Sequence, residues 1–198
     1  MFYNIVRFFL FILLKLSCRI TATGRAYIPR KGGFILASNH TSYLDPMVLA
    51  VTCFRRLNFM ARHDLFINPL FAWLIRQLGA FPVKRKTTDF SAFKEAIRRL
   101  RRGESLVIFP EGTRQGEGVL GDPEKGVGLL AAKLNVPIVP VFIHGAERVL
   151  PKNARSLNAS KISVYFGKQI FVERRTPYQE TAQMVMESIR RLSWSVSK

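Results

Sequence analysis

Hydrophobic and polar positions along the chain follow two different periods. Short apolar runs bounded by Gly, Pro, Asn or Ser predict buried strands, whereas apolar residues that recur every three or four positions predict helices. We expect strands at 34–38, 57–61, 105–109, 136–142 and 161–166. We expect helices at about 46–56, 64–78, 89–102 and 125–135, and a last helix from about Pro177 to the end. This alternation is typical of an α/β fold, so we predict a single domain with a central mixed β-sheet flanked by helices.

The segment 89–102 shows the helical pattern most clearly. Its apolar face comprises Phe90, Phe93, Ile97 and Leu100. Its other positions are mainly cationic and comprise Lys94, Arg98, Arg99, Arg101 and Arg102. A charge run of this kind is either a solvated helix face or a surface for an anionic partner, and both interpretations stay open.

Composition narrows the class of protein and of partner. The 198 residues suffice for one domain with a core, and 31 Lys and Arg against 13 Asp and Glu give a formal net charge of +18. With 48% hydrophobic residues the chain is not a disordered polycation. Its charge calls for a nucleic acid, an anionic membrane or an acidic carrier protein. Cys18 and Cys53 lack a CxxC spacing, which argues against a disulfide scaffold or a cysteine zinc site and favours a reducing compartment.

Residues 1–20 are strongly apolar but interrupted by charge. The uncharged run 8–14 lies between Arg7 and Lys15, whereas a spanning helix needs about 20 apolar residues. Basic side chains reach lipid headgroups while aromatic rings lie in the interface. We therefore expect residues 1–24 to form a helix on the cytoplasmic face of a membrane, followed by a domain over 25–198. The alternatives are a secretory signal ending at residues 22–24 and an ordinary buried helix.

Two glycine motifs match the dinucleotide-binding fingerprint in form only. Residues 116–121 read GEGVLG and residues 126–131 read GVGLLA. The first begins well after the strand at 105–109 and no strand precedes the second, whereas that fingerprint joins a strand tightly to a helix. We interpret them as a glycine loop and a closely packed helix start. The sequence also lacks a G-x-S-x-G elbow and a P-loop, so it gives no support for a serine hydrolase or an NTPase.

A histidine and an aspartate follow the strand at 34–38, within NHTSYLDP at 39–46. Ligands bind at the carboxyl ends of strands in α/β sheets. On a continuous helix His40 and Asp45 would point about 140° apart, but Pro46 favours a turn with Asp45 as the helix cap, and Ser42 with Asp45 could form a capping box instead. Either turn brings the carboxylate to the imidazole and makes the other ring nitrogen a candidate general base. The alternative is a helix cap beside a surface histidine.

Two further segments offer groups that suit a phosphate. In FPEGTR at 109–114, Gly112 lets the backbone approach, Thr113 adds a hydroxyl and Arg114 offers a planar fork. Glu111 would repel a phosphate, so we expect it to orient an arginine or to accept a substrate hydroxyl. In GAFPVKR at 79–85, Arg85 either completes a phosphate clamp or belongs to a solvated basic turn.

In these motifs the chain resembles the PlsC-type glycerolipid acyltransferase family, the 1-acylglycerol-3-phosphate acyltransferases. NHTSYLD at 39–45 is similar to the family's H-x4-D block, and GAFPVKR and FPEGTR are similar to its second and third blocks. VPIVPV at 136–141 is similar to its fourth, and we expect it to be a core strand with prolines at its margins. Four blocks in order make the resemblance specific over 39–141. Residues 1–20 resemble the family's membrane-binding region only in character, and 150–198 carry no block.

The resemblance implies transfer of an acyl group from a thioester to the sn-2 hydroxyl of lysophosphatidic acid, giving phosphatidic acid. By this likeness His40 would deprotonate the hydroxyl and Asp45 would hold His40. The residues that would hold the glycerol phosphate are Arg85, Glu111, Gly112, Thr113 and Arg114. No metal or redox cofactor is required.

The expected partners are membrane lipids, lysophosphatidic acid and an acyl donor, and not a nucleic acid. The donor is either acyl-coenzyme A or an acidic acyl carrier protein, which would suit the cationic helix face at 94–102, and either would bind less tightly at high salt. Two alternatives stay open: the acceptor is another lysophospholipid or glycerol 3-phosphate, or the chain is a non-catalytic basic module that binds a membrane or nucleic acid.

Overall fold

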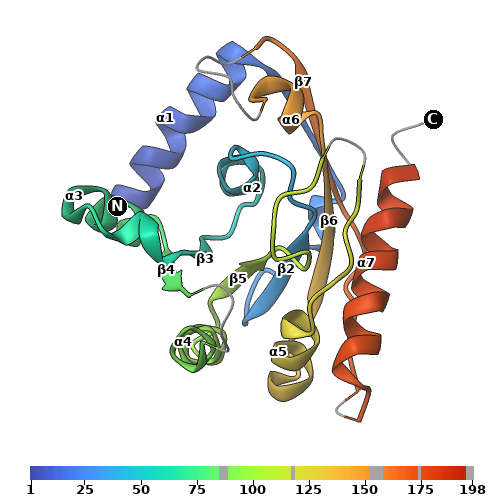
Figure 1. Ribbon diagram of the computed structural model, residues 1–198. Helices are drawn as coiled ribbons and strands as arrows, with labels where there is room; N and C mark the ends of the chain where they lie inside the picture. The colour runs from blue at the N-terminus through green and yellow to red at the C-terminus, as the bar shows by residue number, and fades with distance from the viewer. Residues whose placement is uncertain (85–88, 117–118, 152–157, 174, 195–198) are drawn as a thin grey trace.

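A seven-stranded sheet organises the chain (Figure 1). The computed structural model describes residues 1–84, 89–116, 119–151, 158–173 and 175–194. Within these residues the strands are β1 (Arg19–Thr23), β2 (Phe34–Ser38), β3 (Leu57–Arg62), β4 (Ala80–Val83), β5 (Ser105–Ile108), β6 (Ile138–His144) and β7 (Lys161–Phe166). Their spatial order is β1-β7-β6-β2-β5-β3-β4, and every neighbouring pair is parallel except β6 with β7. The predicted mixed sheet is confirmed.

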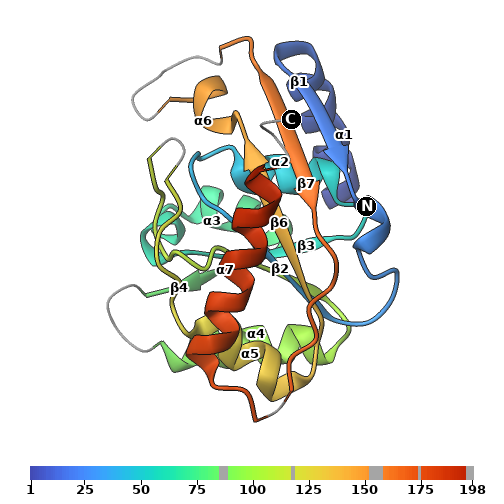
Figure 2. The same ribbon diagram turned by 90° about the vertical axis from the view of Figure 1, so that its right-hand side faces the viewer.

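Helices cover both faces of this sheet, as Figures 1 and 2 show. One face packs against α1 (Phe2–Ser17), α2 (Asp45–Thr52) and α6 (Ala146–Val149). The other packs against α4 (Phe90–Arg101), α5 (Gly126–Leu134) and α7 (Tyr178–Trp194). The fold is therefore a single α/β domain with helical layers on opposite faces of the sheet, as the sequence predicted.

Strand β2 shows how one apolar run supplies both layers. Phe34 and Leu36 belong to the core on the α1 and α2 side, and Ile35 and Ala37 belong to the core under α4, α5 and α7. All four are fully buried. Successive side chains of a strand point to opposite faces, so a strand covered on both sides is apolar throughout.

The N-terminal helix ends earlier than expected. α1 stops at Ser17, and Arg19–Thr23 forms the edge strand β1 in parallel register with β7, so the expected helix through residue 24 is wrong at its end. Residues 19–23 alternate between exposed and half-buried, which is the period of a strand with one face on the core. That pattern is too short to stand out beside the long apolar run before it. None of the helices in the described ranges has the length and apolar character needed to cross a membrane.

The expected helix at 64–78 is two elements. A short 3₁₀ helix, η2 (His63–Phe66), precedes α3 (Pro69–Gln77). Asn68 lies between them and caps α3, because its side-chain oxygen accepts the backbone N–H of Phe71 at 3.0 Å. Pro69 then occupies the first helical position, where its missing N–H costs no hydrogen bond.

Pro140 lies inside β6, not at its margin as predicted. Its register partner on β2 is Ala37. Residues two apart in a strand direct their N–H groups to the same side, and the N–H of Ile138 donates to the carbonyl of Ile170 on the β7 side. The donorless nitrogen of Pro140 therefore faces the chain beyond the end of β7, while its carbonyl accepts the N–H of Gly167 at 2.8 Å. The β2 ladder loses no donor.

The cations of α4 point in two directions. Arg99 turns inward, is 17% exposed, and donates to the Asn58 side chain and the Gly79 carbonyl, so its expected place on the outer face is wrong. Phe90, expected on the apolar face, is 69% exposed. The cations on the outer side of α4 are Lys94, Arg98, Arg101 and Arg102.

Candidate active site

The two motif loops leave neighbouring parallel strands at the same edge of the sheet. β2 and β5 pair with Leu36 opposite Val107 and Ala37 opposite Ile108, and each strand then runs into its loop. The N–H of Gln115 donates to the carbonyl of His40 at 2.8 Å, which ties the loops together. The predicted placement of both motifs at the carboxyl edge is confirmed.

His40 and Asp45 meet across the first loop. His40 Nδ1 lies 2.7 Å from Asp45 Oδ2, and the Asp45 side chain is fully buried whereas that of His40 is 15% exposed. A carboxylate facing Nδ1 holds the proton on that nitrogen and leaves Nε2 with its lone pair. Among the described residues Nε2 has no hydrogen-bond partner. The ring thus offers a free acceptor at the sheet edge.

The turn that joins them is built by Asp45 itself. Its Oδ2 accepts the backbone N–H groups of Thr41 at 2.7 Å and Ser42 at 2.8 Å. The predicted cap is wrong in detail, because Asp45 is the first residue of α2 and Leu44 is the N-cap. Only half of a capping box forms, since Ser42 Oγ accepts from Leu44 and not from Asp45. Asp45 Oδ1 is buried without a partner in the described structure.

Two residues that sequence reasoning did not single out fix the position of His40. The Phe109 ring stacks on the imidazole with centroids 4.0 Å apart and planes 18° apart. Asn39 is buried and exchanges two hydrogen bonds with the backbone of Ile143 on β6, at 2.9 and 2.7 Å. Each is the first residue of a predicted motif, Asn39 of NHTSYLD and Phe109 of FPEGTR, and that position is the signal that could have identified them.

Glu111 is a buried link between loops. Its Oε1 accepts the N–H of His40 and its Oε2 accepts the N–H of Gly121, each at 3.1 Å. It is 6% exposed, and burial raises the pKa of its carboxyl, although these two backbone hydrogen bonds act in the opposite direction. Within the described residues the hydrogen bonds of Glu111 go to backbone amides and not to an arginine. Glu111 positions the backbone at His40.

Gly112 and Thr113 follow Glu111 at the exposed part of the loop. Gly112 has φ of +65°, and a Cβ there would lie 2.4 Å from the carboxylate of Glu124, so this position favours glycine. The N–H of Glu124 donates to the carbonyl of Pro110 at 2.8 Å, which closes the loop. Thr113 is exposed, and its hydroxyl accepts from Gln115 Nε2 at 3.4 Å. The loop therefore presents the Thr113 hydroxyl to solvent, while the N–H of Gly112 donates to the carbonyl of Phe109 at 3.0 Å.

Arg114 lies against the loop that carries His40. Its guanidinium is 3.5 Å from the centre of the Tyr43 ring, and its Nη2 donates to Tyr43 Oη at 2.8 Å. Tyr43 is 58% exposed, so the cation stays accessible while one face is held. Arg85, predicted to complete a phosphate clamp, lies outside the described residues.

The assembled site brings together an imidazole and a guanidinium on two connected loops. In the described parts of the chain no group of three His, Cys, Asp or Glu side chains could hold a metal ion. The free Nε2 of His40 can take a proton, and the Arg114 guanidinium can bind phosphate oxygens. Both lie on loops that Glu111 and Gln115 connect.

Comparison with known proteins places the chain in a family. The family model described as Acyltransferase matches residues 19–144. The 1-acyl-sn-glycerol-3-phosphate acyltransferase of Bacillus subtilis is 30% identical over 135 residues, which cover 68% of this chain and 67% of that protein. The chain belongs to the acyltransferase family, and the resemblance to PlsC-type glycerolipid acyltransferases is confirmed.

Other relatives carry the same description but are longer. The chloroplast enzyme BAT2 of Brassica napus is 31% identical over 140 residues, which cover 69% of this chain and 40% of that protein. The Streptococcus pneumoniae enzyme is 34% identical over 140 residues, which cover 69% of this chain and 50% of that protein. The match thus spans half or less of these relatives.

A solved structure shares the fold across almost the whole chain. The 1-acyl-sn-glycerophosphate acyltransferase PlsC of Thermotoga maritima aligns with a TM-score of 0.86, covering 98% of this chain and 79% of that one. The identity is 24%. At that identity the likeness establishes the architecture, including the N-terminal helix and the edge strand.

Proposed function

We propose that the chain transfers an acyl group from an acyl thioester to the sn-2 hydroxyl of 1-acylglycerol 3-phosphate. The observation that carries the proposal is the 2.7 Å contact of His40 Nδ1 with the buried carboxylate of Asp45, which leaves Nε2 free at the sheet edge. The names of the curated relatives supply the substrate class. No covalent acyl-enzyme is part of the proposal.

The reaction runs through His40 as general base. Nε2 takes the proton of the acceptor hydroxyl as the oxygen attacks the thioester carbon, and Asp45 stabilises the resulting imidazolium. The tetrahedral intermediate then collapses, the C–S bond breaks, and the imidazolium returns its proton to the departing thiolate. The stacked Phe109 ring and the two backbone hydrogen bonds to Asp45 Oδ2 hold the imidazole for both transfers.

The acceptor's phosphate is bound by the second loop. Arg114 offers two parallel N–H donors to phosphate oxygens, and Thr113 adds a hydroxyl. Gly112 lets the loop adopt its left-handed turn beside them. Glu111 acts indirectly, because both of its oxygens are occupied by backbone N–H groups of this chain. Arg85 completes this set in the proposal on the strength of its motif alone.

In this proposal α1 contacts the cytoplasmic face of the bilayer that holds the acceptor. A narrow stripe of α1 that includes Tyr3 and Leu14 is buried on the domain. The outer side is apolar and exposed and comprises Phe2, Ile5, Phe8, Phe9, Phe11, Ile12, Leu13 and Leu16. A helix with such a face, flanked by Lys15 and Arg19, suits the interface of an anionic membrane.

Acyl transfer from a labelled thioester to lysophosphatidic acid tests the proposal. Wild type is expected to form phosphatidic acid, and His40→Ala is expected to lose about two to four orders of magnitude in kcat with unchanged folding by circular dichroism. His63→Ala is the matched control, since His63 is an exposed histidine on η2. Product formation only with another lysolipid or with glycerol 3-phosphate would change the acceptor. Full activity of His40→Ala would overturn the mechanism.

A further inference from the structure

The helix α3 and the residues just before it expose large apolar side chains. Ala72 of α3 is buried, whereas its neighbours point outward. The exposed apolar side chains of η2, α3 and the link between them are 43% to 75% exposed and comprise Leu65, Ile67, Leu70, Phe71 and Trp73. Leu70 and Trp73 are three positions apart and share one side of the helix. A contiguous apolar patch of this kind on a domain marks a contact site.

This patch is continuous with the exposed side of α1. The rings of Phe2 and Trp73 meet with centroids 5.5 Å apart and planes tilted by 59°. Figure 1 shows α3 beside the N-terminal end of α1. Both rings remain partly exposed, Phe2 at 37% and Trp73 at 53%. The exposed apolar side chains of α1, η2 and α3 therefore form one surface, called the α1–α3 face below.

The charge around the α1–α3 face is positive. The sequence has no Asp or Glu in residues 1–44 or 65–88, and Asp64 between these ranges is paired with Arg62. The guanidinium of Arg76, in the last turn of α3, lies 4.9 Å from the centre of the Phe66 ring. Basic side chains beside exposed aromatic rings suit the headgroup level of an anionic membrane, where the cations meet phosphates and the rings lie in the interface.

A bilayer fits this face better than a second copy of the chain does. In a symmetric dimer the same patch meets itself, so the cations at its rim would approach one another. An anionic leaflet instead offers phosphates to these cations and hydrocarbon to the apolar side chains. The charge pattern thus favours the lipid as the occupant.

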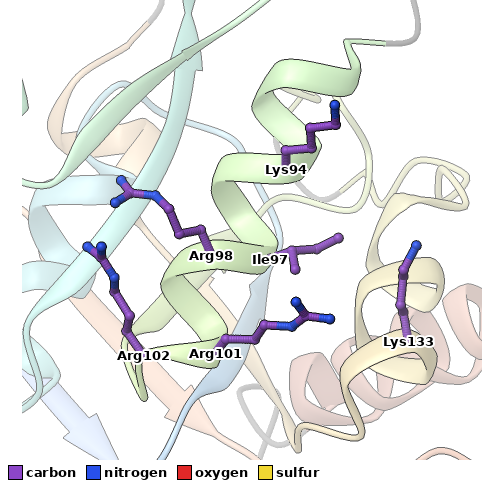
Figure 3. A pocket seen from close by; sticks show the side chains of 6 residues that line it. All are labelled: Lys94, Ile97, Arg98, Arg101, Arg102 and Lys133. Carbon is purple, nitrogen blue, oxygen red and sulfur yellow. The ribbon is translucent and has the colours of Figure 1, made fainter.

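The opposite face of the sheet is built differently. Figure 3 shows a hollow between α4 and α5 that is lined by Ile97 and by the cations Lys94, Arg98, Arg101, Arg102 and Lys133. That hollow offers positive charge with little apolar surface, so it is not suited to insertion into hydrocarbon. The two faces therefore differ in kind, and the α1–α3 face is the one that suits a membrane.

The element η2 begins at the edge of the sheet that carries the H-x4-D loop. Val107 of β5 has Leu36 of β2 and Phe59 of β3 as register partners. Three residues farther along these parallel strands, Asn39 and Arg62 reach the same level. Only β5 lies between β2 and β3, so their ends are about 10 Å apart. The H-x4-D histidine follows Asn39 and η2 follows Arg62, and both therefore leave the sheet at its carboxyl edge.

We propose that η2 and α3 enter the same anionic leaflet as α1, so that the chain holds the bilayer at two elements and keeps the carboxyl edge with His40 at the level of the lipid headgroups. This inference rests on the proposed function, in which α1 alone contacts the membrane. A second contact restricts rotation of the domain about the first. Lysophosphatidic acid then reaches His40 without leaving the leaflet.

The two tryptophans of the chain allow the insertion of α3 to be measured directly. Trp73 lies on α3, and Trp194 ends α7 on the opposite face of the sheet. In Trp194→Phe, the emission of Trp73 is expected to shift to the blue and to be quenched by phosphatidylglycerol vesicles with brominated acyl chains. In Trp73→Phe, the matched control, the emission of Trp194 is expected to keep its wavelength and its intensity. An unquenched Trp73 in chains that float with the vesicles would overturn the insertion.

Charges placed on the patch test its contribution to binding. Ile67→Asp with Leu70→Asp is expected to weaken binding to phosphatidylglycerol vesicles about ten-fold or more. Both side chains are 75% exposed, so the fold is expected to be kept, as circular dichroism would show. Phe171→Asp with Met184→Asp is the matched control, because both side chains are exposed and lie beside or on α7. It is expected to bind as wild type does, and equal losses in the two double variants would overturn the proposal.

Activity on two forms of the acceptor gives a further readout. The α3 double variant is expected to raise the KM for lysophosphatidic acid held in vesicles about ten-fold, and to keep the wild-type KM for a short-chain 1-acylglycerol 3-phosphate dissolved as monomers. An equal rise for both acceptors would contradict a role at the membrane.

The binding measurements separate this inference from the proposed function. Quenching and flotation need no acyl transfer, so they decide the insertion of α3 even if no product forms. Product formation with an unquenched Trp73 would keep the proposed function and remove the inference. Self-association in the absence of vesicles that Ile67→Asp with Leu70→Asp abolishes, measured by sedimentation, would assign the face to a second copy of the chain instead.

Discussion

One carboxylate oxygen of Glu111 accepts the backbone N–H of His40 at 3.1 Å, although 71 positions separate them in the sequence. The bond joins the FPEGTR loop to the H-x4-D loop behind the imidazole. Its other oxygen anchors Gly121 farther along the same loop. The two motifs are therefore one structural unit, and a change at Glu111 is transmitted to His40 through the backbone.

Glu111 should give the protein a specific pH dependence. Burial raises the pKa of Glu111 in the folded chain above the ordinary 4.5 of the unfolded chain. At pH values between the unfolded and the folded pKa, the folded chain binds more protons than the unfolded chain, so the free energy of unfolding falls as pH rises. Glu111→Gln replaces the ionisable carboxyl with an amide, so the variant lacks this contribution to the pH dependence. Urea denaturation from pH 4 to pH 7 is expected to show that the stability difference, wild type minus variant, declines with pH. A constant difference would contradict the raised pKa.

Asp45→Asn should damage the base and the turn together. An amide cannot stabilise the imidazolium, and its NH₂ group favours the wrong tautomer of His40. We expect kcat to fall by about two to four orders of magnitude and stability by about 1–3 kcal/mol. Asp64→Asn is the control, because Asp64 is an exposed aspartate that pairs with Arg62 on the surface. Loss of activity in both variants alike would count against the assigned role of Asp45.

Gly112→Ala should destabilise the phosphate loop. Its φ of +65° costs a residue with a side chain about 1–2 kcal/mol, and the added Cβ meets the Glu124 carboxylate. Gly126→Ala is the matched control, since open space surrounds that position at the start of α5, and alanine there should be neutral or stabilising by up to about 1 kcal/mol. The midpoint of urea denaturation measures the stability of each variant. Equal midpoints for the two variants would contradict the strained turn.

Tyr43 should act through Arg114. Tyr43→Ala removes the ring and hydroxyl that hold the guanidinium, a contact worth about 0.5–1 kcal/mol at an exposed site. The KM for lysophosphatidic acid is expected to rise about two- to five-fold with kcat unchanged, and Tyr43→Phe should recover most of the loss. Tyr178→Ala, on α7, is the control and should have no effect. A fall in kcat alone would assign Tyr43 to the chemical step instead.

The exposed rings of α1 should govern membrane binding. Phe8 and Phe9 are 60% and 64% exposed, and burying one such side chain in an apolar phase contributes about 1.5–3 kcal/mol. Replacing both by Asp should weaken binding to phosphatidylglycerol vesicles at least about ten-fold in a flotation assay. Phe90→Asp, at 69% exposure on the opposite side of the sheet, should leave binding intact. Equal losses would indicate that general hydrophobicity, and not α1, drives binding.

The fold was largely predictable because its strands are apolar on both faces and its helices are not. The strands at 34–38 and 161–166 have the expected bounds. β1 was missed because residues 19–23 show a strand period over only five positions beside a stronger helical run. Pro140 was placed at a margin because the side to which a backbone nitrogen points depends on the partner strand.

Some features of the site were predictable from the sequence and others were not. The chemical groups of His40, Asp45 and Arg114 follow from residue type and from their place after strands, so the sequence alone nominates them. The partners of Glu111 do not follow, because a buried carboxylate accepts whatever donors the fold brings to it, and those donors are the N–H groups of His40 and Gly121.

The sequence by itself determined the α/β class, the strand that precedes each motif and the family, because apolar period and motif order are local properties of the chain. Only the tertiary structure decided that Phe109 stacks on His40, that Arg99 turns inward, and that the cations of α4 and the apolar face of α1 lie on opposite sides of the sheet. These are relations between segments distant in the chain. These relations depend on packing and on the pairing of buried polar groups, and neither produces a periodic pattern in the sequence.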